Sequence, residues 1–203
     1  MLKQKILILI VMMLLIATNR CDAQISQPVD NDKWEKSIVK YTKELEKNPR
    51  SASAFYNRGV AYARKGDLKE AVLDFNQAIL IDPLDKASYS FRGYVYIHQY
   101  ELKSALADYD KAIEISPDDD SLYVYRGYVH NHLNDPDKAI LDLTKAIELK
   151  KNNAIAYSHR AESYLMKKDY KNAIDDATRA KELGYAVPPD LFEQIKSALP
   201  KTN

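Results

Sequence analysis

A repeat of about 34 residues is the feature that most limits how this 203-residue chain can fold. Four series of small or rigid residues keep the same interval: Pro49, Pro83 and Pro117; Gly59, Gly93 and Gly127; Ala71, Ala105, Ala139 and Ala173; and Ala78, Ala112, Ala146 and Ala180. Agreement of several residue types at one period of this length is typical of a solenoid, in which each unit packs against its neighbours.

Each unit is predicted to contain two helices joined by a tight turn. Phe55, Gly59 and Tyr62 fall at helical spacing, and after Gly66 a second amphipathic set covers residues 71–79. The second helix of each unit needs a start signal, which an aspartate side chain supplies by accepting a backbone N–H.

Aspartates stand at this start in three of the units, as Asp67, Asp135 and Asp169, and we expect all three to act as N-caps. Pro136 then occupies the first helical position, where the missing N–H costs nothing. Glu101 is expected to be the weaker cap of the series.

The stretch Phe55-x2-Arg58-Gly59-x2-Tyr62, Ala71-x3-Phe75 and Pro83 resembles the tetratricopeptide repeat. The resemblance implies an all-α, right-handed α-solenoid of four helix-turn-helix repeats, with capping helices at both ends. The expected divisions are an N-terminal capping helix at 33–50, repeats at 52–85, 86–119, 120–153 and 154–187, and a C-terminal capping helix at 188–203.

The amino terminus is predicted to be a secretory signal peptide over residues 1–23, followed by a flexible leader at 24–32. Lys3 and Lys5 precede an apolar run over 6–17, and small residues end at Ala23, where cleavage is expected. This places the protein in the periplasm or outside the cell. Two alternatives stay open: an uncleaved anchor, and a lipid on Cys21, although Arg20 stands where lipoproteins carry a small residue.

Composition argues against catalysis and against nucleic acid. Thirty basic and 29 acidic residues give a net charge of +1, so no strongly basic surface is expected. The five glycines form no phosphate loop, and the mature chain would hold no thiol. We therefore expect no catalytic residue, no cofactor, no metal and no small-molecule substrate. Membrane contact is expected only through an uncleaved signal or a lipid on Cys21.

The four histidines are predicted to be structural rather than catalytic. His130 and His132 point in different directions on one helix, and His130 replaces a repeat tyrosine, which favours a place in the core. No sequence pattern pairs a histidine with an orienting carboxylate.

An arginine and an aspartate recur at one fixed separation in every unit: Arg58 with Asp74, Arg92 with Asp108, Arg126 with Asp142, and Arg160 with Asp176. We predict an ion-pair ladder between the two helices of each unit, because guanidinium pairs well with carboxylate at partly buried sites. The alternatives are pairing across units, as between Asp74 and Arg92, and an anion-binding row of free arginines.

The other face of each first helix is unexpectedly aromatic. In the family that the repeat resembles, first helices line a concave groove, which makes these residues the candidate peptide- or partner-binding site: Tyr56, Asn57, Val60, Phe91, Tyr94, Ile97, His98, Tyr125, Tyr128, Asn131 and His132. Other members of the same faces are Arg64, Ser90, Val124, Ser158, His159, Glu162, Leu165 and Met166. The alternative is that some, especially Val60, Tyr94 and Tyr128, only pack between neighbouring helices.

The function expected from these features is an exported, non-catalytic protein–protein interaction scaffold that holds a peptide or partner helix in its groove. The alternative is a structural or assembly subunit of an envelope complex, or a self-associating solenoid.

Overall fold

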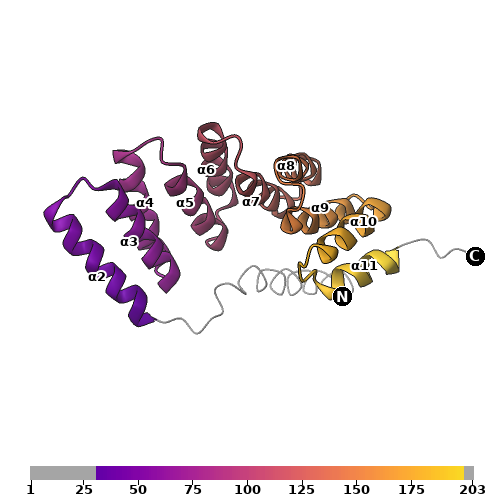
Figure 1. Ribbon diagram of the computed structural model, residues 1–203, viewed down its shortest axis with the longest axis horizontal. Helices are drawn as coiled ribbons and strands as arrows, with labels where there is room; N and C mark the ends of the chain where they lie inside the picture. Colours follow the sequence, from indigo (N-terminus) through magenta and orange to yellow (C-terminus); the bar gives the residue numbers. More distant parts are fainter. Residues whose placement is uncertain (1–30, 199–203) are drawn as a thin grey trace, which may run out of the picture.

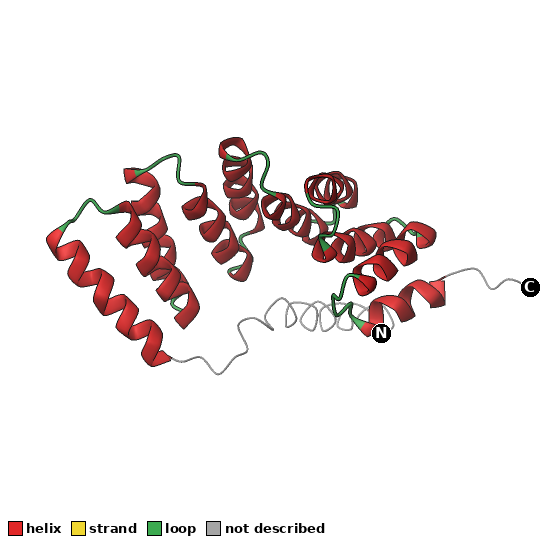
Figure 2. Ribbon diagram, in the orientation of Figure 1, coloured by secondary structure: helices red, strands yellow, loops and turns green. Residues whose placement is uncertain are grey.

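The computed structural model describes residues 31–198, so the expected signal peptide, most of the leader and the last five residues lie outside the described part. Over this range the chain forms ten helices and no strand (Figure 2). After α2 (Asn31–Lys47) come four pairs: α3 (Ala52–Lys65) with α4 (Leu68–Ile81), α5 (Lys86–His98) with α6 (Leu102–Ile115), α7 (Asp120–His132) with α8 (Pro136–Leu149), and α9 (Ala154–Met166) with α10 (Tyr170–Glu182); α11 (Pro189–Ala198) is last. Figure 1 shows them as an arched row in chain order.

The turn inside each pair has the same backbone geometry. A residue with positive φ ends each first helix, at Gly66 (94°), Tyr100 (60°), Asn134 (59°) and Lys168 (60°). The amide of the following residue then donates to the carbonyl five positions back, as from Asp67 to Tyr62, at 2.9 Å in all four units. This is the bond of the Schellman motif, and it satisfies a helix-terminal carbonyl.

Two of the three predicted aspartate caps make the expected bond. Asp135 accepts from the amide of Lys138, and Asp169 from the amide of Asn172. Asp67 occupies the N-cap position, but its side chain accepts no hydrogen bond from a backbone amide of α4, so the predicted cap is wrong here. Its carboxylate lies 3.2 Å from Lys65 Nζ, which competes with the backbone amides for it. Glu101 also makes no cap bond, as expected of the weaker member.

Small residues on the first helix of each pair accommodate large ones on the second. A Cβ added to the glycine would lie within 3.1 Å of the facing side chain in three pairs: Gly59 with Phe75, Gly93 with Tyr109, and Gly127 with Leu143. The fourth unit carries Ala161 and Ala177, both fully buried in one cluster. The glycine is therefore required wherever the facing residue is large.

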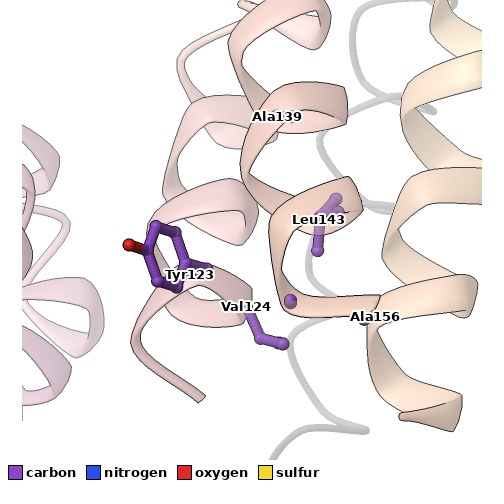
Figure 3. Packing of buried hydrophobic residues seen from close by; sticks show 6 residues of the cluster. Tyr123, Val124, Ala139, Leu143 and Ala156 are labelled. Carbon is purple, nitrogen blue, oxygen red and sulfur yellow. The ribbon is translucent and has the colours of Figure 1, made fainter. Parts of the chain in front are cut away.

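The core runs from unit to unit through clusters shared between pairs. Tyr123, Val124, Ala139, Leu143 and Ala156 belong to one such cluster, with residues from α7, α8 and α9. Figure 3 shows Val124 and Leu143 in the space between these helices. Each unit thus buries its apolar surface against the next, as in other solenoids.

The predicted ion-pair ladder is confirmed. In each unit the arginine Nε and Nη2 donate to both oxygens of the aspartate 16 residues ahead, over distances of 2.6–2.9 Å. The aspartates are buried, and hydrogen bonding to Asp142 raises the pKa of Arg126. Because all four guanidiniums are engaged, the anion-binding row is wrong, and so is pairing of Asp74 with Arg92.

Each ladder arginine also reaches back to the preceding helix. Its Nη1 donates to the residue 16 positions earlier, over 2.5–3.1 Å; these acceptors are Thr42, Asn76, Asp110 and Thr144. Aromatic rings flank the guanidinium, as Tyr89 and Tyr96 do around Arg92, with centroids 5.6 and 5.9 Å away. The ladder therefore joins neighbouring units as well as the two helices within a unit.

The terminal helices cover the two ends of the row. α2 packs on α3 and buries Ile38 and Leu45. At the other end, Leu191 and Ile195 of α11 are buried against alanines of α9 and α10. None of the helices between residues 31 and 198 combines the length and apolarity needed to span a bilayer.

Candidate functional site

A hollow of about 520 Å³ opens over α5, α7 and α9. Seven of the eleven residues predicted for the groove line it: Phe91, Tyr94, Ile97, His98, Tyr125, Tyr128 and His132. Tyr94 and His98 on α5, and Tyr128 and His132 on α7, are four residues apart, which places each pair on one face of its helix. The repeat period then sets the two pairs side by side.

Three tyrosines of this lining, Tyr94, Tyr125 and Tyr128, each make ring contacts, and we call them the aromatic strip. The tyrosine and histidine of each pair meet edge to face, with centroids 4.5 Å apart for Tyr94 and His98 and 4.3 Å for Tyr128 and His132. Tyr125 connects the two helices through an edge contact with Tyr94 at 6.3 Å. Each such contact favours a fixed arrangement of the two rings.

Tyr109 of α6 supports the strip from below. Its ring is fully buried and stacks on Tyr125, with centroids 5.6 Å apart and ring planes 8° from parallel. The Tyr109 hydroxyl has no hydrogen-bond partner among the described residues, and burial raises the pKa of this phenol well above its ordinary value. The equivalent residue of the first unit is Phe75, which fills the same position without a hydroxyl.

Three predicted groove residues of the first unit lie outside the hollow. Tyr56 packs edge-on against Phe91 at 5.6 Å, and Val60 packs on the core cluster of Phe75. Asn57 donates to the carbonyl of Ser53 in its own helix. For Val60 the structure therefore agrees with the packing alternative, because this side chain joins the cluster that α3, α4 and α5 share.

Asn131 also lies outside the lining and ties α7 to α9. Its side-chain amide donates to the carbonyl of His159 at 3.1 Å and accepts from the Ser163 hydroxyl at 2.7 Å. Tyr128 lines the hollow and also packs against a core cluster with residues from α6 and α7, so its position fits either of the two alternatives. Tyr94 lines the hollow and belongs to neither of the core clusters described around α5.

The histidines occupy two different environments. His130 is buried, as expected of a core substitute, and burial lowers its pKa while Asp142 partly opposes that effect. His159 lines the hollow with its Nδ1 3.0 Å from Glu162 Oε2. The expectation that no carboxylate orients a histidine is therefore wrong for His159. Among residues 31–198, no three His, Cys, Asp or Glu side chains are grouped to hold a metal.

Several lining residues come from turns that the sequence reasoning did not consider. Tyr100 follows α5, Lys150 and Asn153 lie between α8 and α9, and Tyr185 follows α10. Asn153 donates to the carboxylate of Asp120 at 2.6 Å, which fixes this edge of the hollow. Helical periodicity could not identify these residues, because they lie outside the helix faces to which it applies.

Comparison with known proteins agrees with this architecture. Sequence models of the tetratricopeptide repeat match residues 52–84, 87–119 and 108–141. Among curated proteins, none matches the chain in sequence.

Solved structures with a similar fold include MamA, at 22% identity and a TM-score of 0.70, over 74% of this chain and 88% of that one. TTC0263, a thermophilic tetratricopeptide repeat protein of Thermus thermophilus, has 22% identity and a TM-score of 0.63, over 82% and 91%. YrrB, described as having an unusual peptide-binding site, has 18% identity and a TM-score of 0.64, over 79% and 93%. At these identities the likeness is one of fold.

Proposed function

The chain is a tetratricopeptide repeat protein, and from this premise we propose that it is an exported, non-catalytic scaffold that binds an extended peptide or a partner helix in the hollow over α5, α7 and α9. The aromatic strip of Tyr94, Tyr125 and Tyr128 carries the proposal. Tyrosine offers a large contact area and a hydrogen-bonding hydroxyl at a low cost in side-chain entropy, which suits a peptide-binding surface.

The size and chemistry of the hollow favour a short segment of a partner. A volume of about 520 Å³ lies in the range of pockets that enclose one small ligand or a few side chains. Its lining combines rings with hydroxyl, imidazole and amide groups, which can bind both the side chains and the backbone of an extended peptide. The peptide-binding site named for YrrB supports the proposal by analogy of fold.

Export is proposed from the amino terminus. Two lysines, an apolar run over 6–17 and small residues ending at Ala23 follow the order of a secretory signal. Mass analysis of the protein isolated from its native envelope should show a chain that starts at Gln24. A diacylglycerol adduct on Cys21 or an intact Met1 would contradict the cleaved form.

The test of the groove compares binding and stability in the same variants. Tyr94→Ala and Tyr128→Ala should each weaken binding of a partner purified from the envelope by about 1–3 kcal/mol, the range of an aromatic hot spot. Tyr41→Ala, on α2 and away from the hollow, is the matched control and should leave affinity unchanged. Tyrosine variants that melt early but bind normally would assign the strip to packing alone.

A second candidate function, self-association, is favoured by exposed leucines on second helices. Leu73, Leu80 and Leu141 expose 64%, 74% and 70% of their surface. Leu73 and Leu80 are seven residues apart on α4, which places them on one face of this helix. Light scattering separates the two functions. A mass that rises with protein concentration, and that Leu73→Ser with Leu80→Ser returns to the monomer value, would favour self-association.

A further inference from the structure

α2 carries a regular row of lysines, Lys33, Lys36, Lys40, Lys43 and Lys47. Their spacing alternates between three and four residues, which aligns them on one face of a helix. All five are exposed, and at 1.5 Å per residue the row is about 20 Å long. We call this face the lysine stripe.

The acidic residues of α2 (Asp32, Glu35, Glu44 and Glu46) offset part of this charge, but none of them forms an ion pair with Lys36, Lys40, Lys43 or Lys47. Glu35 pairs with Lys65 of α3 at 2.7 Å, and Glu44 accepts a hydrogen bond from Ser51. Within residues 31–198, Lys36, Lys40, Lys43 and Lys47 form no ion pair. The net charge of +1 argued against a strongly basic surface, but this argument misses a local concentration of charge on one helix.

The stripe also has a shape and an apolar element that suit a membrane surface. Four of its lysines, Val39 and Glu44 line a shallow, open depression along α2, and Val39 is 47% exposed. α2 is the first described helix and packs on α3, so the stripe lies at the end of the row of helices (Figure 1). A cationic helix face with an exposed apolar residue is typical of attachment to anionic lipid.

The position of the stripe in the chain points to the same partner. The apolar run over 6–17 ends only a short stretch of chain before α2 begins at Asn31, so the segment that directs the chain to a membrane leads directly into the stripe. Membrane attachment generally needs two signals, of which a basic patch is one. An adjacent apolar run would contribute nothing to the binding of nucleic acid or of an acidic protein, so its presence favours a membrane as the partner.

We propose that the lysine stripe of α2 docks the protein on an anionic lipid bilayer by binding headgroup phosphates. The sequence reasoning confined membrane contact to residues 1–23, and the stripe adds a second contact on a different segment. In a chain that starts at Gln24 the stripe acts without the apolar run, so its binding is weaker and reversible. The stripe is independent of the groove, which lies over other helices.

The test measures partitioning of the full chain onto vesicles of phosphatidylglycerol and phosphatidylcholine, compared with phosphatidylcholine alone. The ratio of the two partition coefficients isolates the charge contribution, because an apolar segment would enter both vesicles. Lys36→Gln, Lys40→Gln and Lys43→Gln together should lower this ratio by roughly 100-fold. In 1 M salt, where screening acts within about 3 Å, the ratio for the natural chain should approach one.

The matched control removes the same charge elsewhere. Lys103→Gln, Lys145→Gln and Lys171→Gln change exposed lysines on α6, α8 and α10 and should leave the ratio unchanged. Thermal melting checks that both triple variants are folded. An equal loss in both triples, or no preference for anionic vesicles, would overturn the proposal.

Two further outcomes would also overturn it in favour of other anions. One is displacement from vesicles by inorganic phosphate at the concentration of the headgroups, which would identify a site for free phosphate. The other is stripe-dependent binding to a DNA oligonucleotide or polyglutamate without binding to vesicles, which would identify a different macromolecule.

Discussion

The side of the first helices that carries the ladder arginine is the same in all four units, whereas the side that faces the hollow repeats only between α5 and α7. The ladder has the same arginine and the same aspartate in all four units. At the groove positions the four units carry Val60, Tyr94, Tyr128 and Glu162 at one place, and Arg64, His98, His132 and Met166 at another.

The difference follows from what each side contacts. In a solenoid the same rotation and translation relate each unit to the next, so the residues that fix this geometry must recur in every unit. Residues that face a partner follow the partner's shape instead, and a partner need not share the period of the solenoid. The two sides therefore separate the framework from the proposed binding surface, and substitutions on them should have separable effects.

The largest effect is expected in the framework, where Leu143→Ala should lower the free energy of unfolding by about 2–5 kcal/mol because it empties a fully buried site. Gly127→Ala alone should lower the free energy of unfolding by about 1–3 kcal/mol, since the new Cβ would lie 2.8 Å from Leu143 Cγ. In the Leu143→Ala background the same change should cost nothing, reproducing the Ala161 and Ala177 pair. Urea unfolding of the four proteins gives the coupling, and strict additivity would contradict it.

Arg92→Ala should lower stability by about 1–3 kcal/mol while the folded fraction binds its partner normally. The change leaves the Asp108 carboxylate buried and unpaired, and it also removes the link to Asn76. Arg179, half exposed on α10, is the control, and its alanine variant should stay within about 0.5 kcal/mol of the natural chain. A loss of affinity in the folded Arg92 variant would show that framework and groove are coupled.

Tyr109→Phe and Tyr123→Phe compare a buried hydroxyl that has no hydrogen-bond partner among the described residues with one that has a partner. The Tyr109 hydroxyl has no partner among the described residues, so its removal should leave stability unchanged or raise it by up to about 1 kcal/mol. The Tyr123 hydroxyl donates to the carbonyl of Pro117 at 3.0 Å, and its removal should cost about 0.5–1.5 kcal/mol. Thermal denaturation measures both. A clear loss for Tyr109→Phe would mean that its hydroxyl has a partner in solution.

The smallest effect concerns pH and the histidine next to the ladder. Burial lowers the pKa of His130, so below its ordinary value near 6.5 the unfolded chain takes up a proton that the folded chain resists. Stability should therefore fall as the pH decreases from about 7.5 to about 5.5. His130→Tyr restores the residue of the other units and should flatten this dependence, leaving the part due to His132, whose pKa burial also lowers. An unchanged pH profile in the variant would contradict this role.

The fold could be predicted almost entirely, because its determinants are local or periodic. The common interval of the prolines, glycines and alanines identified the units, and the spacing of 16 between Arg58 and Asp74 identified the ladder. The backward bonds of the same arginines could not be predicted, since their acceptors change from Thr42 to Asn76 to Asp110. Thr, Asn and Asp side chains all accept this hydrogen bond, so no single residue type in the sequence identifies the acceptor position.

The hollow was predicted only in part, because the helical residues Leu102, Asp120, Ser121 and Ile155 were missed along with the turns. Periodicity gives the direction of a side chain about its own helix, which placed Tyr94 and Tyr128. It does not give the distance between neighbouring helices, which decides that Tyr56 packs on Phe91 rather than opening into the hollow. Nor does it describe turns, from which Tyr100 joins the lining.

The ladder arginines have a consequence for how such a chain can change length. Every arginine finds one partner 16 residues behind it and one 16 residues ahead, and the sum of these intervals is shorter than one repeat. A duplicated block of one whole repeat, such as 86–119, would bring its own arginine and aspartate, use an acceptor of the preceding unit and supply one to the following unit. Insertion or loss of whole units therefore leaves the pattern of ladder bonds intact, and the row of helices can be lengthened without redesign of what holds it together.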